Sequence, residues 1–198
     1  MKKKSLLFVL FFAITTLSYG QKETGAVLLS NLEAFSNRQG TFLFEESNSL
    51  GYFSDVSGRL DFNWTVYTDF KANEKYGGLK LTIYSDNPII KNMIEGGVTV
   101  RTTFYIDFEE IETLYSFVTY FEENLHKQTP TDNTSFQFIS KEGTEYSFYN
   151  NPGLKKWIFK VSPYPYTNEF TYILKKETID NLLGVLKQAK DIIVNRTK

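Results

Sequence analysis

Apolar and polar residues alternate along several segments of the chain, and alternation with a period of two is typical of strands that bury one face. The clearest segment is residues 59–70, where every second residue from Leu60 to Val66 is apolar. Further strands are predicted at residues 41–46, 79–84, 98–106, 135–140, 145–150, 155–161 and 168–174. Residues 47–58, which are rich in Gly, Ser and Asp, are predicted to form a loop.

Two segments, residues 104–125 and 172–193, share an apolar pattern at an offset of 68 residues. The positions that are apolar in both copies are Ile111 and Ile179, Leu114 and Leu182, Tyr115 and Leu183, Val118 and Leu186, Phe121 and Ala189, and Leu125 and Ile193. Their spacing lays one stripe along a helix, so each segment is predicted to contain an amphipathic helix. The match extends into the preceding strand, where Phe104 aligns with Tyr172.

Each half is therefore predicted to consist of four strands followed by a helix, in pseudo-repeats at about residues 41–127 and 135–195. A short helix at residues 26–37, which ends before Gly40, precedes the first repeat. Alternating strands bury one face, as antiparallel sheets do, and an amphipathic helix covers that face. The predicted fold class is α+β, a single domain over residues 21–198 with antiparallel sheets and approximate internal two-fold symmetry.

The polar residues of the first repeat have no counterparts in the second. Asp107, Glu110 and Glu112 align with Lys175, Thr178 and Asp180. A duplicated active site would repeat its charged groups. The repeat therefore indicates a fold built twice rather than a site built twice.

The order of elements resembles that of the Whirly and PUR-type folds that bind single-stranded nucleic acid, and the resemblance lies in topology alone. The segments SNLEAFSNRQGTFLFEE (residues 30–46) and YIDFEEIETL (residues 105–114) also resemble a group of small exported bacterial proteins of unknown function. The first resemblance implies a nucleic-acid-binding module as an alternative function, although a fold by itself does not fix a function. The second implies no activity.

The chain begins with the features of a secretory signal peptide. Three lysines at residues 2–4 precede an apolar run at residues 6–17, and Ser18-Tyr19-Gly20 has the small residues that signal peptidase requires. The apolar run is too short to span a bilayer core of roughly 30 Å as a helix. We expect cleavage after Gly20 and an exported protein that is periplasmic or secreted, with no stable membrane span.

Composition and charge exclude several classes of function. The chain contains no cysteine, so it has no disulfide, no lipid-acceptor thiol and no thiol nucleophile. Removal of the three signal lysines takes the formal net charge from −1 to about −4, and neither sign forms a long run. This balance opposes binding of nucleic acid, which requires a basic surface.

Candidate catalytic groups are few. The single histidine, His126, is expected at the C-terminal end of the first long helix, where the helix dipole favours a cation without any catalytic role. Asp107, Glu109, Glu110 and Glu112 crowd the first turn of that helix, and Asp107 with Glu110 fits a capping pattern. No calcium-binding loop is present.

Gly77-Gly78 and Gly96-Gly97 each precede a predicted strand instead of opening a helix, so they are interpreted as turn glycines and not as a phosphate loop. No catalytic, cofactor-binding or metal-binding residue is therefore predicted, and no cofactor is expected. A hydrolase that uses two carboxylates is an alternative, although the sequence names no such pair.

The most promising binding segment is WIFKVSPYPYTNEF, residues 157–170. Trp157, Tyr164 and Tyr166 are the candidate partner-binding residues, because tyrosines between prolines on a stiffened loop contact a sugar or an extended peptide at low entropy cost. The alternative is that the two tyrosines fold over the edge of the core. The leading hypothesis is an exported, non-enzymatic domain that binds a protein or glycan or that has an envelope role.

Overall fold

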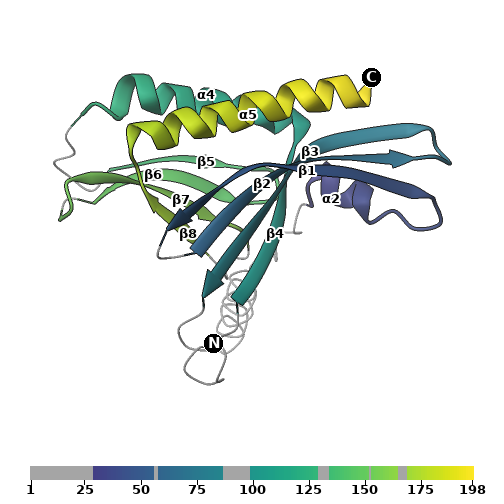
Figure 1. Ribbon diagram of the computed structural model, residues 1–198, viewed down its shortest axis with the longest axis horizontal. Helices are drawn as coiled ribbons and strands as arrows, with labels where there is room; N and C mark the ends of the chain where they lie inside the picture. The colour runs from purple at the N-terminus through teal and green to yellow at the C-terminus, as the bar shows by residue number, and fades with distance from the viewer. Residues whose placement is uncertain (1–28, 56–57, 87–98, 129–133, 152, 165–168) are drawn as a thin grey trace, which may run out of the picture.

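The computed structural model describes residues 29–55, 58–86, 99–128, 134–151, 153–164 and 169–198. These residues form two four-stranded antiparallel sheets, each with its strands in chain order (Figure 1). Sheet A contains β1 (Leu43–Asp55), β2 (Gly58–Asp69), β3 (Glu74–Asp86) and β4 (Thr99–Asp107), and sheet B contains β5 (Ser135–Ile139), β6 (Glu145–Asn151), β7 (Lys156–Ser162) and β8 (Phe170–Ile173). The predicted α+β class with four strands in each half is confirmed. The predicted signal peptide, residues 1–20, lies outside the described residues.

Among the described residues, three α-helices accompany the sheets: α2 (Asn31–Ser36), α4 (Phe108–Tyr120) and α5 (Lys176–Thr197). A π-helical turn, η2 (Phe121–Leu125), extends α4. Both long helices are confirmed, as is the N-terminal helix from Asn31 onward; residues 26–28 lie outside the described part. None of the helices described has the length and apolar character needed to cross a membrane.

The loop predicted at residues 47–58 is wrong, because β1 continues through this stretch to Asp55 and pairs with β2 along its length. A β-bulge between Ser49 and Gly51 interrupts the register, and Gly51 has a φ of 138°. Phe53 is buried here, whereas most of its neighbours in β1 are exposed. Because most of this stretch is exposed and the bulge interrupts its register, it lacks the alternation by which strands are recognised, and its sequence looks like that of a loop.

Each long helix covers the sheet that belongs to the other half. In α4 and η2, Phe117 stacks on Phe136 with ring centroids 4.5 Å apart, and Phe121 stacks on Phe148 at 3.9 Å. Helix α5 instead packs on β2 and β3 of sheet A. The two helices lie side by side on one side of the sheets (Figure 1). This exchange ties the two halves together.

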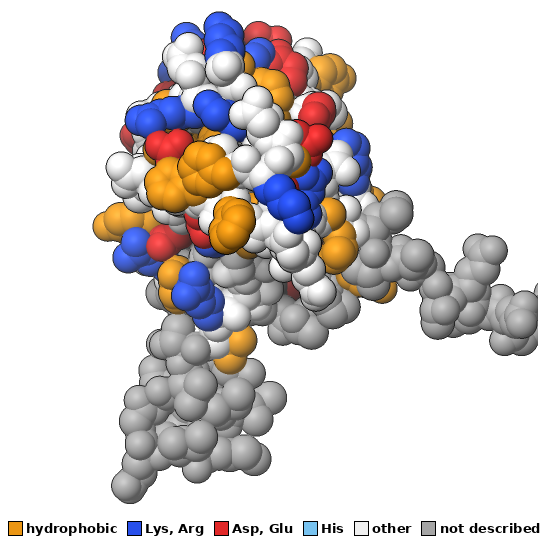
Figure 2. Space-filling model, turned by 90° about the vertical axis from the view of Figure 1, so that its right-hand side faces the viewer, with side chains coloured by type: hydrophobic (Ala, Val, Ile, Leu, Met, Phe, Trp, Pro, Cys, Tyr) orange, Lys and Arg blue, Asp and Glu red, His pale blue; other side chains and the backbone are white. Residues whose placement is uncertain are grey.

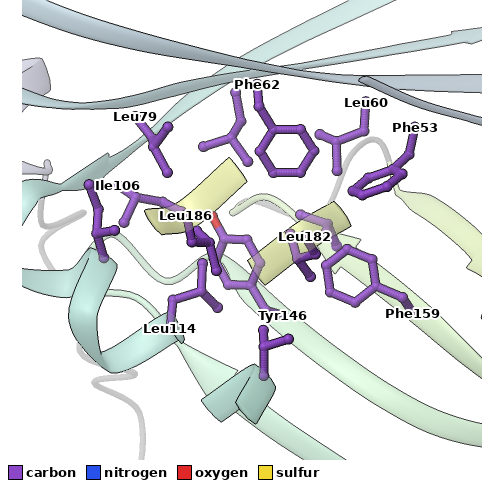
Figure 3. Close-up of a cluster of buried hydrophobic side chains, with 14 of the residues drawn as sticks. Phe53, Leu60, Phe62, Leu79, Ile106, Leu114, Tyr146, Phe159, Leu182 and Leu186 are labelled. Atoms are coloured by element: carbon purple, nitrogen blue, oxygen red, sulfur yellow. The ribbon is translucent and has the colours of Figure 1, made fainter. Parts of the chain in front are cut away.

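The core is therefore one continuous cluster that includes residues from both sheets and both long helices. Figure 3 shows its centre, where side chains from sheet A face those from sheet B and from the two helices. The labelled residues are Phe53, Leu60, Phe62, Leu79, Ile106, Leu114, Tyr146, Phe159, Leu182 and Leu186, and all of them are buried. The predicted apolar stripes supply this core: Ile111, Leu114 and Val118 are buried in α4, as are Ile179, Leu182 and Leu186 in α5.

Helix α2 packs on the opposite face of sheet A from α5. Leu32 and Phe35 are buried there against Tyr67. The two carboxylate oxygens of Asp107 accept hydrogen bonds from the backbone N–H groups of Asn31 and Leu32, both at 2.9 Å. Helix α2 is thereby fixed to the end of β4, close to the end of sheet A at which β1 begins.

Candidate partner-binding site

Three phenylalanines at one end of sheet A are unusually exposed. Phe42, Phe44 and Phe70, here called the Phe42 patch, have exposed fractions of 75%, 50% and 66%. The rings of Phe44 and Phe70 touch, with centroids 6.2 Å apart. Figure 2 looks onto this end of the molecule and shows hydrophobic side chains beside one another, bordered by charged ones. Contiguous exposed apolar side chains of this kind mark interaction surfaces in many soluble proteins.

The position of these rings follows from strand parity. Phe44 lies opposite Thr68 in the β1–β2 ladder and shares its face with Glu46, which pairs with Val66. This is the face that α5 covers, because Arg196 near the end of α5 forms an ion pair with Glu46 at 2.8 Å. Helix α5 ends at Thr197, one residue after Arg196, but the sheet continues. The apolar face of the sheet therefore extends past the end of the helix that covers it.

Charged residues beside the patch on the α5 face are paired, among them Arg196 with Glu46. Arg38 contacts the carboxylates of Asp69 and Glu74 on the opposite face of the sheet, next to α2. Lys75 donates to the backbone carbonyl of Arg196 at 3.0 Å, and Lys71 donates to that of Gly40 at 3.1 Å. An apolar centre with a polar rim is the usual anatomy of a protein interface.

The residues predicted from the sequence do not form one surface. Trp157 is buried: its indole N–H donates to the carbonyl of Gln128 at 3.3 Å, and its ring meets Phe121 edge to face at 5.1 Å. Tyr164 has an exposed fraction of 45% and lies against Gly143 of the β5–β6 turn. Trp157 is the second residue of β7, whereas Tyr164 follows the other end of that strand, and Tyr166 lies outside the described residues. A role of these residues in binding stays a prediction, although the burial of Trp157 favours a core role for that residue.

The predicted cap at the start of α4 is wrong for Asp107. Its side chain makes no capping hydrogen bond to α4 and instead accepts from α2, as described above. The spacing of Asp107 and Glu110 had assigned this carboxylate to α4. It binds instead the N–H of Leu32, which lies 75 positions earlier in the chain. Glu110 accepts a hydrogen bond from the backbone N–H of Lys141, at 2.7 Å, in the β5–β6 turn.

Glu142 from the β5–β6 turn joins Asp107 and Glu110 where the two halves meet, and these three carboxylates are here called the acidic junction. Burial raises the pKa of Glu142 to about 7, with hydrogen bonds from the Tyr105 N–H at 3.0 Å and the Thr144 hydroxyl at 3.2 Å acting in the opposite direction. Burial also raises the pKa of Glu110, an effect that the N–H of Lys141 opposes. Both side chains are thereby biased toward their neutral forms.

Two buried polar atoms near the acidic junction have no hydrogen-bond partner among the described residues: Oε2 of Glu110 and the hydroxyl of Tyr146. Burial raises the pKa of Tyr146, and the carboxylates of Glu142 and Glu110 raise it further. Within the described part of the chain, no group of three or more His, Asp or Glu side chains has an arrangement that could hold a metal ion. The junction is a polar contact between the two halves, in which Glu142 accepts from the N–H of Tyr105 and Glu110 accepts from that of Lys141.

The carboxylates that line the groove between the two long helices are poorly suited to hydrolysis. An open groove between α4 and α5 is lined in part by Glu112 and Asp191. Glu112 is largely exposed and forms an ion pair with Lys190. A solvated, paired carboxylate lacks the environment that tunes a catalytic acid or base. His126, expected at the end of the first long helix, does lie there, directly after η2 and with its ring centroid 5.9 Å from that of Phe121.

The Phe42 patch was missed by reasoning from the sequence, although a signal was present. Phe42 and Phe44 lie in the predicted strand 41–46 with Leu43 between them, so both faces of that strand are apolar at its start. A half-buried strand should be apolar on one face only. Phe70 lies an even number of positions from Leu60 to Val66 and so shares their apolar face, but it lies past the end of α5, the helix that covers that face.

Comparison with protein-family models finds no match to this chain, and comparison with curated proteins finds no significant match.

Proposed function

We propose that this protein is an exported, non-enzymatic domain that binds an apolar segment of a protein partner through the Phe42 patch. The observation that supports this proposal is the exposure of three phenylalanines on the uncovered end of an otherwise buried sheet face. Burying a phenylalanine side chain contributes about 1.5–3 kcal/mol. A protein partner that covers two or three of them gains enough free energy for specific association.

A protein partner suits the patch better than a glycan does. Phenylalanine has no polar group, whereas sugar recognition combines stacking with hydrogen bonds to hydroxyl groups. The charged side chains beside the patch on the α5 face are engaged: Arg196 pairs with Glu46, and Lys75 donates to the backbone carbonyl of Arg196. The side chains of the patch are therefore apolar rings rather than hydrogen-bonding groups.

The described face of sheet A opposite α5 gives little support to the nucleic-acid alternative. Two of its cations are neutralised, Arg59 by Asp61 and Lys80 by Glu45. Arg101 lies over the ring of Tyr84, with 5.9 Å between its guanidinium carbon and the ring centroid. Such mixed charge does not provide the series of phosphate contacts on which nucleic-acid affinity depends.

The proposal is tested by capture from an envelope extract with residues 21–198 as bait, followed by direct titration of the captured protein in purified form. The double variant Phe42→Ser with Phe70→Ser is compared with Tyr120→Ser, which removes a similarly exposed ring from α4. We expect the double variant to weaken the affinity at least about tenfold and the control to change it less than about twofold. Equal affinity of all three proteins, or no partner enriched by the wild-type chain, would contradict the proposal.

A further inference from the structure

The first half of β1 forms an open edge of sheet A. Among the described residues, β1 pairs with β2 and with no other strand. Its far end approaches sheet B, where Phe53 contacts Tyr172 with ring centroids 5.7 Å apart. The near half, residues 43–49, lies beside the Phe42 patch and has no neighbouring strand in the described structure.

The register shows which backbone groups point outward along this edge. Phe42 accepts a hydrogen bond from the N–H of Phe70, its opposite neighbour. In an antiparallel ladder the hydrogen-bonded residues alternate with residues whose N–H and C=O groups point away from the partner strand. Leu43, Glu45 and Ser47 are therefore the residues that direct both groups away from β2. The N–H of Ser49, next in this series, donates to Oδ1 of Asn48 at 2.8 Å, so the open stretch ends there.

The open stretch has few of the devices that usually protect a sheet edge. Proteins block edges with proline, with bulges or with charged side chains, most often lysine. Residues 43–49, LFEESNS, contain neither proline nor lysine, and the bulge of β1 comes only after Ser49. The two carboxylates of the stretch are drawn inward, because Glu45 pairs with Lys80 of β3 at 2.9 Å and Glu46 pairs with Arg196 of α5 at 2.8 Å.

Charge indicates the kind of strand that would fit. The sequence of β1, LFEESNSLGYFSD, carries three acidic residues and no basic residue. A second copy of β1 would bring acidic strands together, and like charges on adjacent strands are unfavourable. A neutral or basic strand avoids this repulsion. Side chains of such a strand on the α5 side of the sheet would lie next to Phe44, which favours apolar residues at alternate positions.

We infer that the partner binds by strand addition: an extended, neutral or basic segment of it pairs with Leu43, Glu45 and Ser47 and places alternate apolar side chains on the Phe42 patch. This inference rests on the proposed function and names its mode. Backbone hydrogen bonds supply the pairing, and the phenylalanines supply apolar contact on one face only. The segment becomes a fifth strand of sheet A.

The first test uses a synthetic peptide in which valine and threonine alternate between terminal lysines, together with the same peptide methylated at every second backbone nitrogen. Titration followed by NMR should show the unmethylated peptide binding at least about tenfold more tightly, since methylation removes its donors. Amide exchange should slow at residues 43, 45 and 47 and stay unchanged at residues 44 and 46, whose groups already face β2. Equal binding of the two peptides, no binding of the unmethylated peptide, or uniform protection would overturn the inference.

The second test changes the edge itself. Ser47→Pro removes an outward N–H and leaves the pairing with β2 intact, because proline is tolerated at an edge position whose N–H faces solvent. Ser47→Ala is the matched control: it also removes the hydroxyl that contacts Thr65 at 3.0 Å but keeps the N–H. We expect about a tenfold loss of peptide affinity for the proline variant and less than a twofold change for the alanine variant. Equal affinity of the two variants would overturn the inference, as would a homodimer that Ser47→Pro dissociates.

These results are distinguishable from failure of the proposed function. If the serine variants of Phe42 and Phe70 lose the captured partner while backbone methylation and Ser47→Pro have no effect, the patch binds a partner by another mode and strand addition is wrong. If the patch variants bind the partner normally, the proposed function itself is wrong.

Discussion

Replacement of Glu142 by glutamine should remove a pH dependence of folding stability. The carboxylate of Glu142 accepts hydrogen bonds from Tyr105 and Thr144 at the acidic junction, and burial raises its pKa from 4.5 to about 7. Below about pH 4.5 the side chain is protonated in the folded and the unfolded chain alike. Between the two pKa values the unfolded chain releases the proton while the folded chain retains it, so the free energy of unfolding falls as the pH rises. Above about pH 7 the decrease is complete.

The size of the effect follows from the shift. Each pKa unit corresponds to about 1.4 kcal/mol, so a rise from 4.5 to about 7 corresponds to a loss of about 3 kcal/mol, most of it between about pH 4.5 and about pH 7. Glutamine keeps an acceptor oxygen for Tyr105 and Thr144 but does not ionise. Glu142→Gln should therefore match the wild type at low pH and exceed its stability by up to about 3 kcal/mol at pH 8.

Denaturant unfolding at several pH values measures this difference directly. Glu123→Gln, on the exposed surface of η2, is the matched control and should follow the wild-type curve. Some slope should persist in Glu142→Gln, because Glu110 has a raised pKa at the same junction. A wild-type stability that is constant or rises from about pH 5 to about pH 8, or a Glu142→Gln curve parallel to it, would refute the reasoning.

Two further predictions concern packing, and thermal and denaturant unfolding check both. Phe148→Ala should lower the free energy of unfolding by about 3–5 kcal/mol, because this fully buried ring stacks on Phe121 of η2, from the other half. Phe42→Ala, the exposed control, should change it by less than about 0.5 kcal/mol. Similar destabilisation by the two variants would contradict the exchange of helices. Gly77→Ala should lower the free energy of unfolding by about 1–3 kcal/mol, since the new Cβ would come within 2.6 Å of Ile193. Gly184→Ala, which has open space around it in α5, should raise the free energy of unfolding by about 0.5–1 kcal/mol. An unchanged stability of Gly77→Ala would mean that α5 does not pack tightly there.

Local periodicity made much of the fold predictable. The strand at residues 59–70 and the two apolar stripes were recognisable because the residues of one face recur at two positions or at three and four positions along the chain. The stretch of β1 from Ser47 onward was not recognisable, because it is mostly exposed and its bulge interrupts the period. Its conformation is set by pairing with β2, whose sequence lies beyond the turn.

The candidate site was predictable only in part. Tyr164 is exposed as a loop tyrosine should be, but Trp157 is buried against Phe121, which comes from the other half of the chain. Asp107 was assigned to the helix next to it and instead binds α2, about 75 positions earlier. In each case a contact between distant segments decided the role of the side chain, and spacing along the chain carries no record of such contacts.

The sequence by itself determined the secondary structure of most segments and the inward face of each, because these depend on near neighbours and on the fixed periods of helix and strand. Tertiary structure alone decided that α5 covers sheet A and where that cover stops. Phe42, Phe44 and Phe70 have the apolar character of core residues, and they are exposed because the helix ends at Thr197 while the sheet beneath it continues.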